Sequence, residues 1–134
     1  MRVVIDTNVL ISALFWGGMP RRVVDLAVAG RIQAVTSPAL LVELERVLGA
    51  DFGMPADRVA LAVRDVLAYS EVVLPGEVGD EARDPEDNHV IACAVAGGAD
   101  QIVTGDSDLL VLKRVRGARI STVRAFVDEQ RRPQ

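Results

Sequence analysis

Short aliphatic runs alternate with longer stretches of helical periodicity along the chain. Runs of β-branched and other apolar residues, each ended by a polar or turn-forming residue, predict strands at residues 3–5, 31–36, 71–74, 101–104 and 118–121. Apolar residues at three- and four-residue intervals predict helices at 9–15, 20–29, 38–48, 55–70, 87–96 and 123–130, with a short helix within 108–115. This alternation predicts an α/β fold in which a parallel five-stranded sheet has helices on both faces.

Length and composition agree with this architecture. The chain has 134 residues, of which half are hydrophobic and few are aromatic, so layered packing of aliphatic side chains is expected. There is no repeat or linker, so we expect a single domain over 1–134, with 131–134 as a frayed tail. The single cysteine, Cys93, excludes an internal disulfide and a thiolate zinc site. We see no signal peptide or membrane span and expect a cytoplasmic protein without membrane contact.

The net charge of −4 is unevenly distributed. Residues 77–108 contain nine acidic residues and one basic residue, whereas residues 113–134 contain seven basic and two acidic residues. Overall acidity argues against non-specific nucleic-acid binding, but it does not exclude a nuclease whose acidity is concentrated at a metal site. The basic C-terminal segment either guides an RNA backbone or forms a plain solvated face.

Four carboxylates stand where a solvated surface charge is not expected. Asp6 and Asp106 each follow a strand, Asp87 is expected to begin an apolar helix, and Glu43 lies within an apolar helical stripe. The carboxyl ends of parallel strands and the helices that follow them lie at one edge of a sheet, so these side chains are expected to converge. The alternatives are a helix cap or turn for each aspartate and an exposed helical position for Glu43.

A converging set of carboxylates repels itself unless protons or cations neutralise the charge. Oxygen donors without a cysteine cluster, in a chain with a single histidine, favour Mg²⁺ or Mn²⁺ over zinc. Such ions serve phosphate chemistry, because they activate water and stabilise the charge that develops on the phosphate. The acidic residues therefore predict a metal-dependent phosphodiester hydrolase.

Four sequence blocks occur in the order found in PIN domains. They are 4–13, Ser37-Pro38 with Glu43, 83–88 and 103–110. Because they span nearly the whole chain, the sequence resembles a PIN domain, and it is most similar to the VapC-type toxins of toxin–antitoxin systems. The resemblance implies a three-layer, Rossmann-like sheet with strand order 3-2-1-4-5, in which the strands that precede Asp6 and Asp106 are neighbours.

The resemblance also implies which residues form the site. The catalytic and metal-binding set by motif position is Asp6, Glu43, Asp87 and Asp106. The accessory positions are Thr7, Asn8, Asp84, Thr104 and Asp108. The implied activity is a Mg²⁺- or Mn²⁺-dependent endoribonuclease, with RNA as substrate, a small antitoxin as partner and a homodimer as the assembly. The alternative is a PIN scaffold that binds RNA or protein with little nuclease activity.

Two further expectations concern single positions, and one alternative fold is excluded. Thr7 or Asn8 is expected to cap the first helix. Trp16, in a glycine-rich break, is expected to anchor in the core, with contact to RNA bases or to a partner as the alternative. A phosphoacceptor receiver-like domain is excluded, because its third strand must end in an aspartate, where this chain has Leu74-Pro75.

Overall fold

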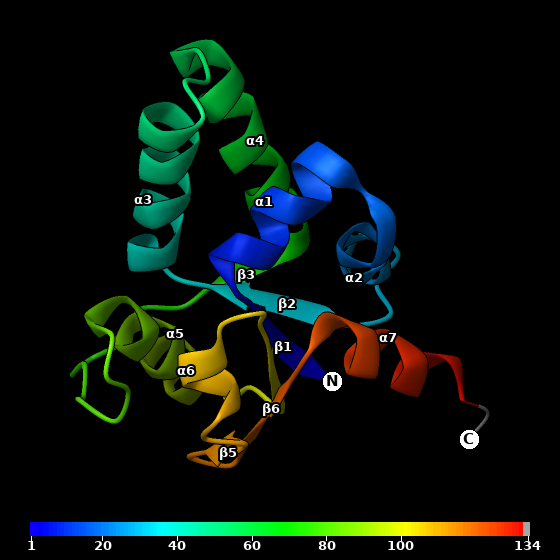
Figure 1. Cartoon of the computed structure of the whole chain (residues 1–134), viewed down its shortest axis with the longest axis vertical. Coiled ribbons are helices and arrows are strands. Elements are labelled where there is room, and N and C mark those ends of the chain that lie inside the picture. The colour runs from blue at the N-terminus through cyan, green and yellow to red at the C-terminus, as the bar shows by residue number, and fades with distance from the viewer. Residues whose placement is uncertain (133–134) are drawn as a thin grey trace.

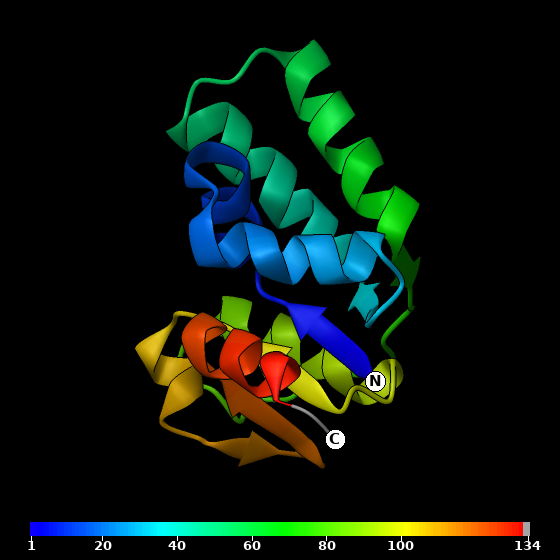
Figure 2. The ribbon, with the colours of Figure 1, turned by 90° about the vertical axis from the view of Figure 1, so that its right-hand side faces the viewer.

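The computed structural model describes residues 1–132 and contains one six-stranded sheet with helices on both faces (Figure 1 and Figure 2). The strands are β1 (Arg2–Ile5), β2 (Gln33–Thr36), β3 (Ser70–Val72), β4 (Gln101–Val103), β5 (Arg114–Val115) and β6 (Ala118–Ser121). Their order is β3-β2-β1-β4-β6-β5, and every neighbouring pair is parallel except β5 and β6. The α/β class is confirmed, and the five predicted strands stand in the predicted order.

The prediction of an all-parallel, five-stranded sheet was wrong at one edge, where β5 pairs antiparallel with β6. A two-residue turn joins them, and both of its residues have positive φ, Arg116 at 50° and Gly117 at 87°. Two positive φ angles are typical of a type I′ turn, whose twist matches that of the flanking strands. Such turns are usually Asn-Gly or Asp-Gly, so the Arg-Gly pair gave little sign of a hairpin.

The helices are α1 (Thr7–Trp16), α2 (Gly18–Val28), α3 (Pro38–Arg46), the π-helix η1 (Val47–Asp51), α4 (Ala56–Tyr69), α5 (Pro85–Ala96), α6 (Ser107–Leu110) and α7 (Val123–Arg131). Asp6 occupies the N-cap of α1, so the prediction that Thr7 or Asn8 caps this helix was wrong. Of the predicted frayed tail, residues 133–134 lie outside the described residues. No helix within residues 1–132 is both long and apolar enough to cross a bilayer.

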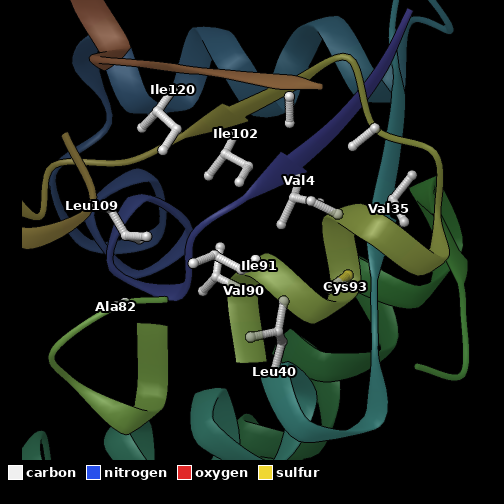
Figure 3. Close-up of a cluster of buried hydrophobic side chains, with 13 residues drawn as sticks. Val4, Val35, Leu40, Ala82, Val90, Ile91, Cys93, Ile102, Leu109 and Ile120 are labelled. Atoms are coloured by element: carbon white, nitrogen blue, oxygen red, sulfur yellow. The ribbon is translucent and has the colours of Figure 1, made fainter. Parts of the chain in front are cut away.

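Alternate residues of β1 face opposite layers, as strand geometry requires. Val3 and Ile5 pack with residues of α2 and α7, including the fully buried Phe126. Val4 packs on the other face with residues of α5 (Figure 3). Cys93 of α5 is fully buried in this second cluster, and burial raises the pKa of its thiol to about 11. Cys93 therefore behaves as a small buried apolar residue.

A third cluster lies between α1, α3 and α4, which rise together from one part of the sheet (Figure 1). At the end of α1, the side chain of Trp16 is 71% exposed, so the prediction that it anchors in the core was wrong. Its ring centroid lies 5.6 Å from that of Phe15 and 6.4 Å from that of Phe52. These three residues, the exposed aromatic group, bring apolar surface to the outside of the molecule.

Candidate metal centre

Two neighbouring strands end at buried polar residues. Asp6 follows β1 and is 4% exposed, and Thr104 follows β4 and is fully buried. The hydroxyl of Thr104 donates a hydrogen bond of 2.7 Å to Oδ2 of Asp6 and accepts one of 3.0 Å from the backbone N–H of Asp106. A single hydroxyl therefore connects Asp6 to the turn that carries Asp106.

Three aspartates from two helix starts form an acidic triplet, Asp84, Asp87 and Asp106. Each can offer one carboxylate oxygen such that all three oxygens lie within 4.8 Å of one another. Asp84 and Asp106 are the N-caps of α5 and α6, and their Oδ1 atoms accept hydrogen bonds from Glu86 N at 3.0 Å and Asp108 N at 2.8 Å, respectively. Helix capping therefore fixes two of the three carboxylates at this edge of the sheet.

Asp87 is the buried member of the triplet, at 5% exposure, and its Oδ2 has no hydrogen-bond partner within the described residues. Burial raises the pKa of Asp87 to about 7, and repulsion from Asp106, Asp84 and Asp6 adds to the shift. Burial also raises the pKa of Asp6, with a further contribution from Asp106, against the hydrogen bond from Thr104 that lowers it. Without a cation, the site therefore retains protons well above the usual carboxylate range.

Glu43 does not belong to the triplet but lies on α3 beside Glu86, in the first turn of α5. Burial raises the pKa of Glu43 to about 8, together with a hydrogen bond to Glu86 and repulsion from Glu86 and Asp6. Sequence reasoning did not select Glu86, because an acid in the first turn of a helix is common there for its interaction with the helix dipole. Its pairing with Glu43 depends on how α3 and α5 pack.

The expectation that Asp87 begins the helix was wrong, because α5 begins at Pro85 after its N-cap Asp84. An aspartate followed by proline is a favoured helix start, so the first turn begins earlier and places Asp87 within it. Of the accessory residues, Asp108 pairs with Arg83 at 3.3 Å instead of joining the triplet.

The remaining two accessory residues lie at the start of α1. Thr7 is buried, its hydroxyl has no hydrogen-bond partner among residues 1–132, and Asn8 is exposed. The catalytic and accessory roles of all these residues stay predictions.

The donor set suits a hard divalent cation. Carboxylate oxygens from separate elements converge, and the unpartnered, buried oxygen of Asp87 is a donor that a cation satisfies better than solvent can. A cation would also remove the repulsion that raises the pKa of Asp6 and Asp87. The arrangement fits Mg²⁺ or Mn²⁺, and Asp84, Asp87 and Asp106 are the residues that can hold it directly.

Comparison of the sequence with known proteins identifies a family and a relative. A family model described as PIN domain matches residues 2–108. Protein MJ1680 of Methanocaldococcus jannaschii, itself uncharacterized, is 33% identical in a match that covers 84% of this chain and 76% of that protein.

Solved structures show the same fold at low sequence identity. A chain in the structure of VapBC2 from Rickettsia felis bound to a promoter DNA fragment superposes with a TM-score of 0.67 at 17% identity, covering 91% of this chain and 98% of that one. VapBC-1 from nontypeable Haemophilus influenzae gives a TM-score of 0.66 at 16% identity, covering 92% and 99%. PAE2754 from Pyrobaculum aerophilum gives 0.62 at 16% identity, covering 96% and 88%. Because the family model matches most of this chain, the chain belongs to the PIN domain family.

Proposed function

We propose that this chain is a Mg²⁺- or Mn²⁺-dependent endoribonuclease. The observation that carries the proposal is the buried carboxylate of Asp87, which has an unpartnered oxygen and lies in a triplet of oxygens within 4.8 Å of one another. Burying a charged group without a partner is costly, so such an arrangement is expected where a cation is bound. Membership of the PIN domain family and the resemblance to VapC-type toxins support RNA as the substrate.

In the proposed site, separate residues bind the cation, orient Asp6 and hold a proton. Asp84, Asp87 and Asp106 hold the cation, which when bound supplies a more acidic water and stabilises negative charge on the phosphate. Thr104 orients Asp6 toward the same centre through its 2.7 Å hydrogen bond. Glu43, beside Glu86 and with a pKa raised to about 8, is the carboxyl group assigned to hold a proton near neutral pH.

The experiment is cleavage of a labelled single-stranded RNA by the purified chain with Mg²⁺, with Mn²⁺ and with excess EDTA. We expect cleavage with either ion, none with EDTA, and none by Asp106→Asn. Asp128→Asn, which changes an exposed aspartate of α7, is the matched control and should cleave like the unmodified chain. An intact protein that binds RNA without cutting it, and binds no Mn²⁺ at millimolar concentration, would instead be a PIN scaffold used for binding.

We further propose that the chain is the toxin of a cytoplasmic toxin–antitoxin pair, with a small antitoxin as partner. Two structurally similar chains come from VapBC structures, which supports a partner of this kind. The exposed aromatic group is the kind of surface that a protein partner covers. A groove of about 820 Å³ is lined by residues of α1, α2 and α4, including Leu14, which precedes Phe15 in the chain. We place the antitoxin contact at the exposed aromatic group.

The partner proposal is tested with the product of a small reading frame adjacent to this gene. Trp16→Ala and Phe52→Ala should each weaken its binding at least tenfold and leave RNA cleavage by the free chain unchanged, because central aromatic anchors dominate protein interfaces. Leu74→Ala, which truncates a side chain that is 79% exposed on another loop, is the control. Sedimentation of the purified chain tests the expected homodimer.

A further inference from the structure

Asn88 follows Asp87 on α5, yet its side chain bonds to the preceding loop. Its Oδ1 accepts a hydrogen bond of 2.8 Å from the backbone N–H of Ala82, and its Nδ2 donates one of 3.1 Å to the carbonyl oxygen of Ala82. Asn88 is 7% exposed and Ala82 is 6% exposed, so both hydrogen bonds are buried. One side chain therefore pairs with both backbone groups of a residue six positions earlier.

Ala82 lies in the loop of residues 73–84, which connects β3 to α5 and contains neither helix nor strand. Its methyl group belongs to the buried cluster that also includes Leu109 and Val90 (Figure 3). Backbone groups in such a place are costly if they remain unpaired. Within residues 1–132, Asn88 is the hydrogen-bond partner of both, so this contact fixes the path of the loop.

Two residues after Ala82, the same loop delivers Asp84 to the acidic triplet. Two ion pairs also connect this loop to later segments, Arg83 with Asp108 of α6 at 3.3 Å and Glu81 with Arg116 at 2.9 Å. The side chain of Arg83 is 87% exposed, and exposed ion pairs contribute little to rigidity. Apart from the cap bond that Asp84 itself accepts from Glu86 N, the buried contact of Asn88 is therefore the one expected to hold the loop that carries Asp84 in place.

We propose that Asn88 is a positioning residue, which keeps Asp84 in the metal centre through its two hydrogen bonds to Ala82. The proposal rests on the proposed function, because it assigns a task to a neighbour of the same centre. A side-chain amide suits the task because it carries a donor and an acceptor together, as a peptide group does. A carboxylate at this position cannot donate to the carbonyl, and an aliphatic side chain can form neither bond.

The test is the affinity for Mn²⁺ measured by calorimetry, alongside the melting temperature of each variant. Asn88→Ala should weaken Mn²⁺ binding about tenfold, which is the lower end of the usual effect of residues that orient metal ligands. Asp84→Asn keeps an oxygen that can cap α5 but removes the charge. In that background, Asn88→Ala should change the affinity by less than about twofold, because residues that act through one another are not additive.

Ser121→Ala is the control for lost stability alone. It removes the buried 2.9 Å hydrogen bond from Ser121 to Gln101, and it should lower the melting temperature while leaving Mn²⁺ affinity unchanged. Asn88→Ser, which can bond only one of the two groups of Ala82, should fall between the unmodified chain and Asn88→Ala. It also serves as the measured variant if Asn88→Ala does not fold.

Two results would overturn the positioning role. One is an unchanged Mn²⁺ affinity in Asn88→Ala and Asn88→Ser. The other is a loss of Mn²⁺ affinity on Asn88→Ala that is equally large in the unmodified chain and in the Asp84→Asn variant. Asn88 would then act on the fold in general and not through Asp84. Failure of the proposed function gives a different result. The unmodified chain would then bind no Mn²⁺ at millimolar concentration, and its Mn²⁺ affinity would not differ from that of Asp106→Asn. In that case both proposals are wrong.

Discussion

The hydroxyl of Thr104 donates a 2.7 Å hydrogen bond to the carboxylate of Asp6, across the ends of two neighbouring parallel strands. Thr104 is fully buried and Asp6 nearly so, which limits the access of water to this contact. In such surroundings a hydrogen bond to a charged group is stronger than in water. The contact sets the orientation of Asp6 relative to Asp106, whose backbone N–H bonds to the same hydroxyl.

Replacing Thr104 with valine should therefore damage the site more than the fold. Thr104→Val keeps the shape of the side chain but removes both hydrogen bonds, and we expect RNA cleavage to fall about 10- to 100-fold, as for other residues that orient metal ligands. The unfolding free energy should fall by about 1–3 kcal/mol, because the N–H of Asp106 loses its partner. Thr104→Ser retains the hydroxyl and should keep most of the activity. Full cleavage by Thr104→Val would show that Asp6 needs no such support.

The stability of the metal-free protein should depend on pH in the direction opposite to that of most acid-rich proteins. The pKa of Asp87 is raised from 3.8 to about 7, and that of Glu43 from 4.5 to about 8. Between the unfolded and folded pKa values the folded state binds more protons, so the unfolding free energy falls as pH rises from about 5 to 8. Thermal melts in EDTA across this range should show the decline. A melting temperature that rises over the same window would contradict the raised pKa values.

Neutralising Asp87 should stabilise the empty protein and remove its response to metal. Asp87→Asn has nearly the same shape but no charge, so it relieves the repulsion from Asp84 and Asp106. At pH 8 in EDTA, it should melt at a higher temperature than the unmodified chain, and its dependence on pH should be weaker. Mg²⁺ at about 100 times its dissociation constant should stabilise the unmodified chain by about 2.7 kcal/mol and Asp87→Asn by much less.

Asp128→Asn on α7 is again the control, and should match the unmodified chain in both melts. An Asp87→Asn variant that melts at a lower temperature than the unmodified chain in EDTA would mean that the charge of Asp87 does not destabilise the empty fold.

Proximity of Asp6 to the segment of Asp106 could be predicted from sequence, because adjacent parallel strands end at the same edge. The order of the five parallel strands followed from the resemblance. The start of α5 could not be located, since the stretch from Asp84 to Asp87 contains three acids and a proline, and helix ends are uncertain by one or two residues. That uncertainty decided which acids were assigned to the centre.

Other features depend on tertiary packing, for which the chain has no periodic signal. The direction of the Asn88 side chain depends on the path of an irregular loop. The pairing of Glu43 with Glu86 depends on how two helices meet. The exposure of Trp16 depends on the break between α1 and α2, because an aromatic residue is equally typical of a core and of an interface.

The end of α5 offers a prediction about the fold itself. Gly97 follows the helix, and a Cβ atom there would lie 2.5 Å from Cγ1 of Val35 and 3.1 Å from the carbonyl oxygen of Cys93. Val35 is buried in β2, so it has little room to move. Gly97→Ala should therefore lower the unfolding free energy by about 1–3 kcal/mol, as extra atoms do in a packed core.

The matched control for Gly97→Ala is Gly49→Ala in η1, where an added Cβ atom meets nothing within 4 Å. It should leave the unfolding free energy unchanged or raise it by up to about 1 kcal/mol, because alanine favours a helical segment more than glycine does. Urea titrations of the two variants give the comparison directly, because both add the same methyl group to the same residue type. If the two variants unfold at the same urea concentration, α5 can shift against β2 without cost. The packing that holds Asp84 and Asp87 at the other end of the helix would then be looser than the contact between Gly97 and Val35 indicates.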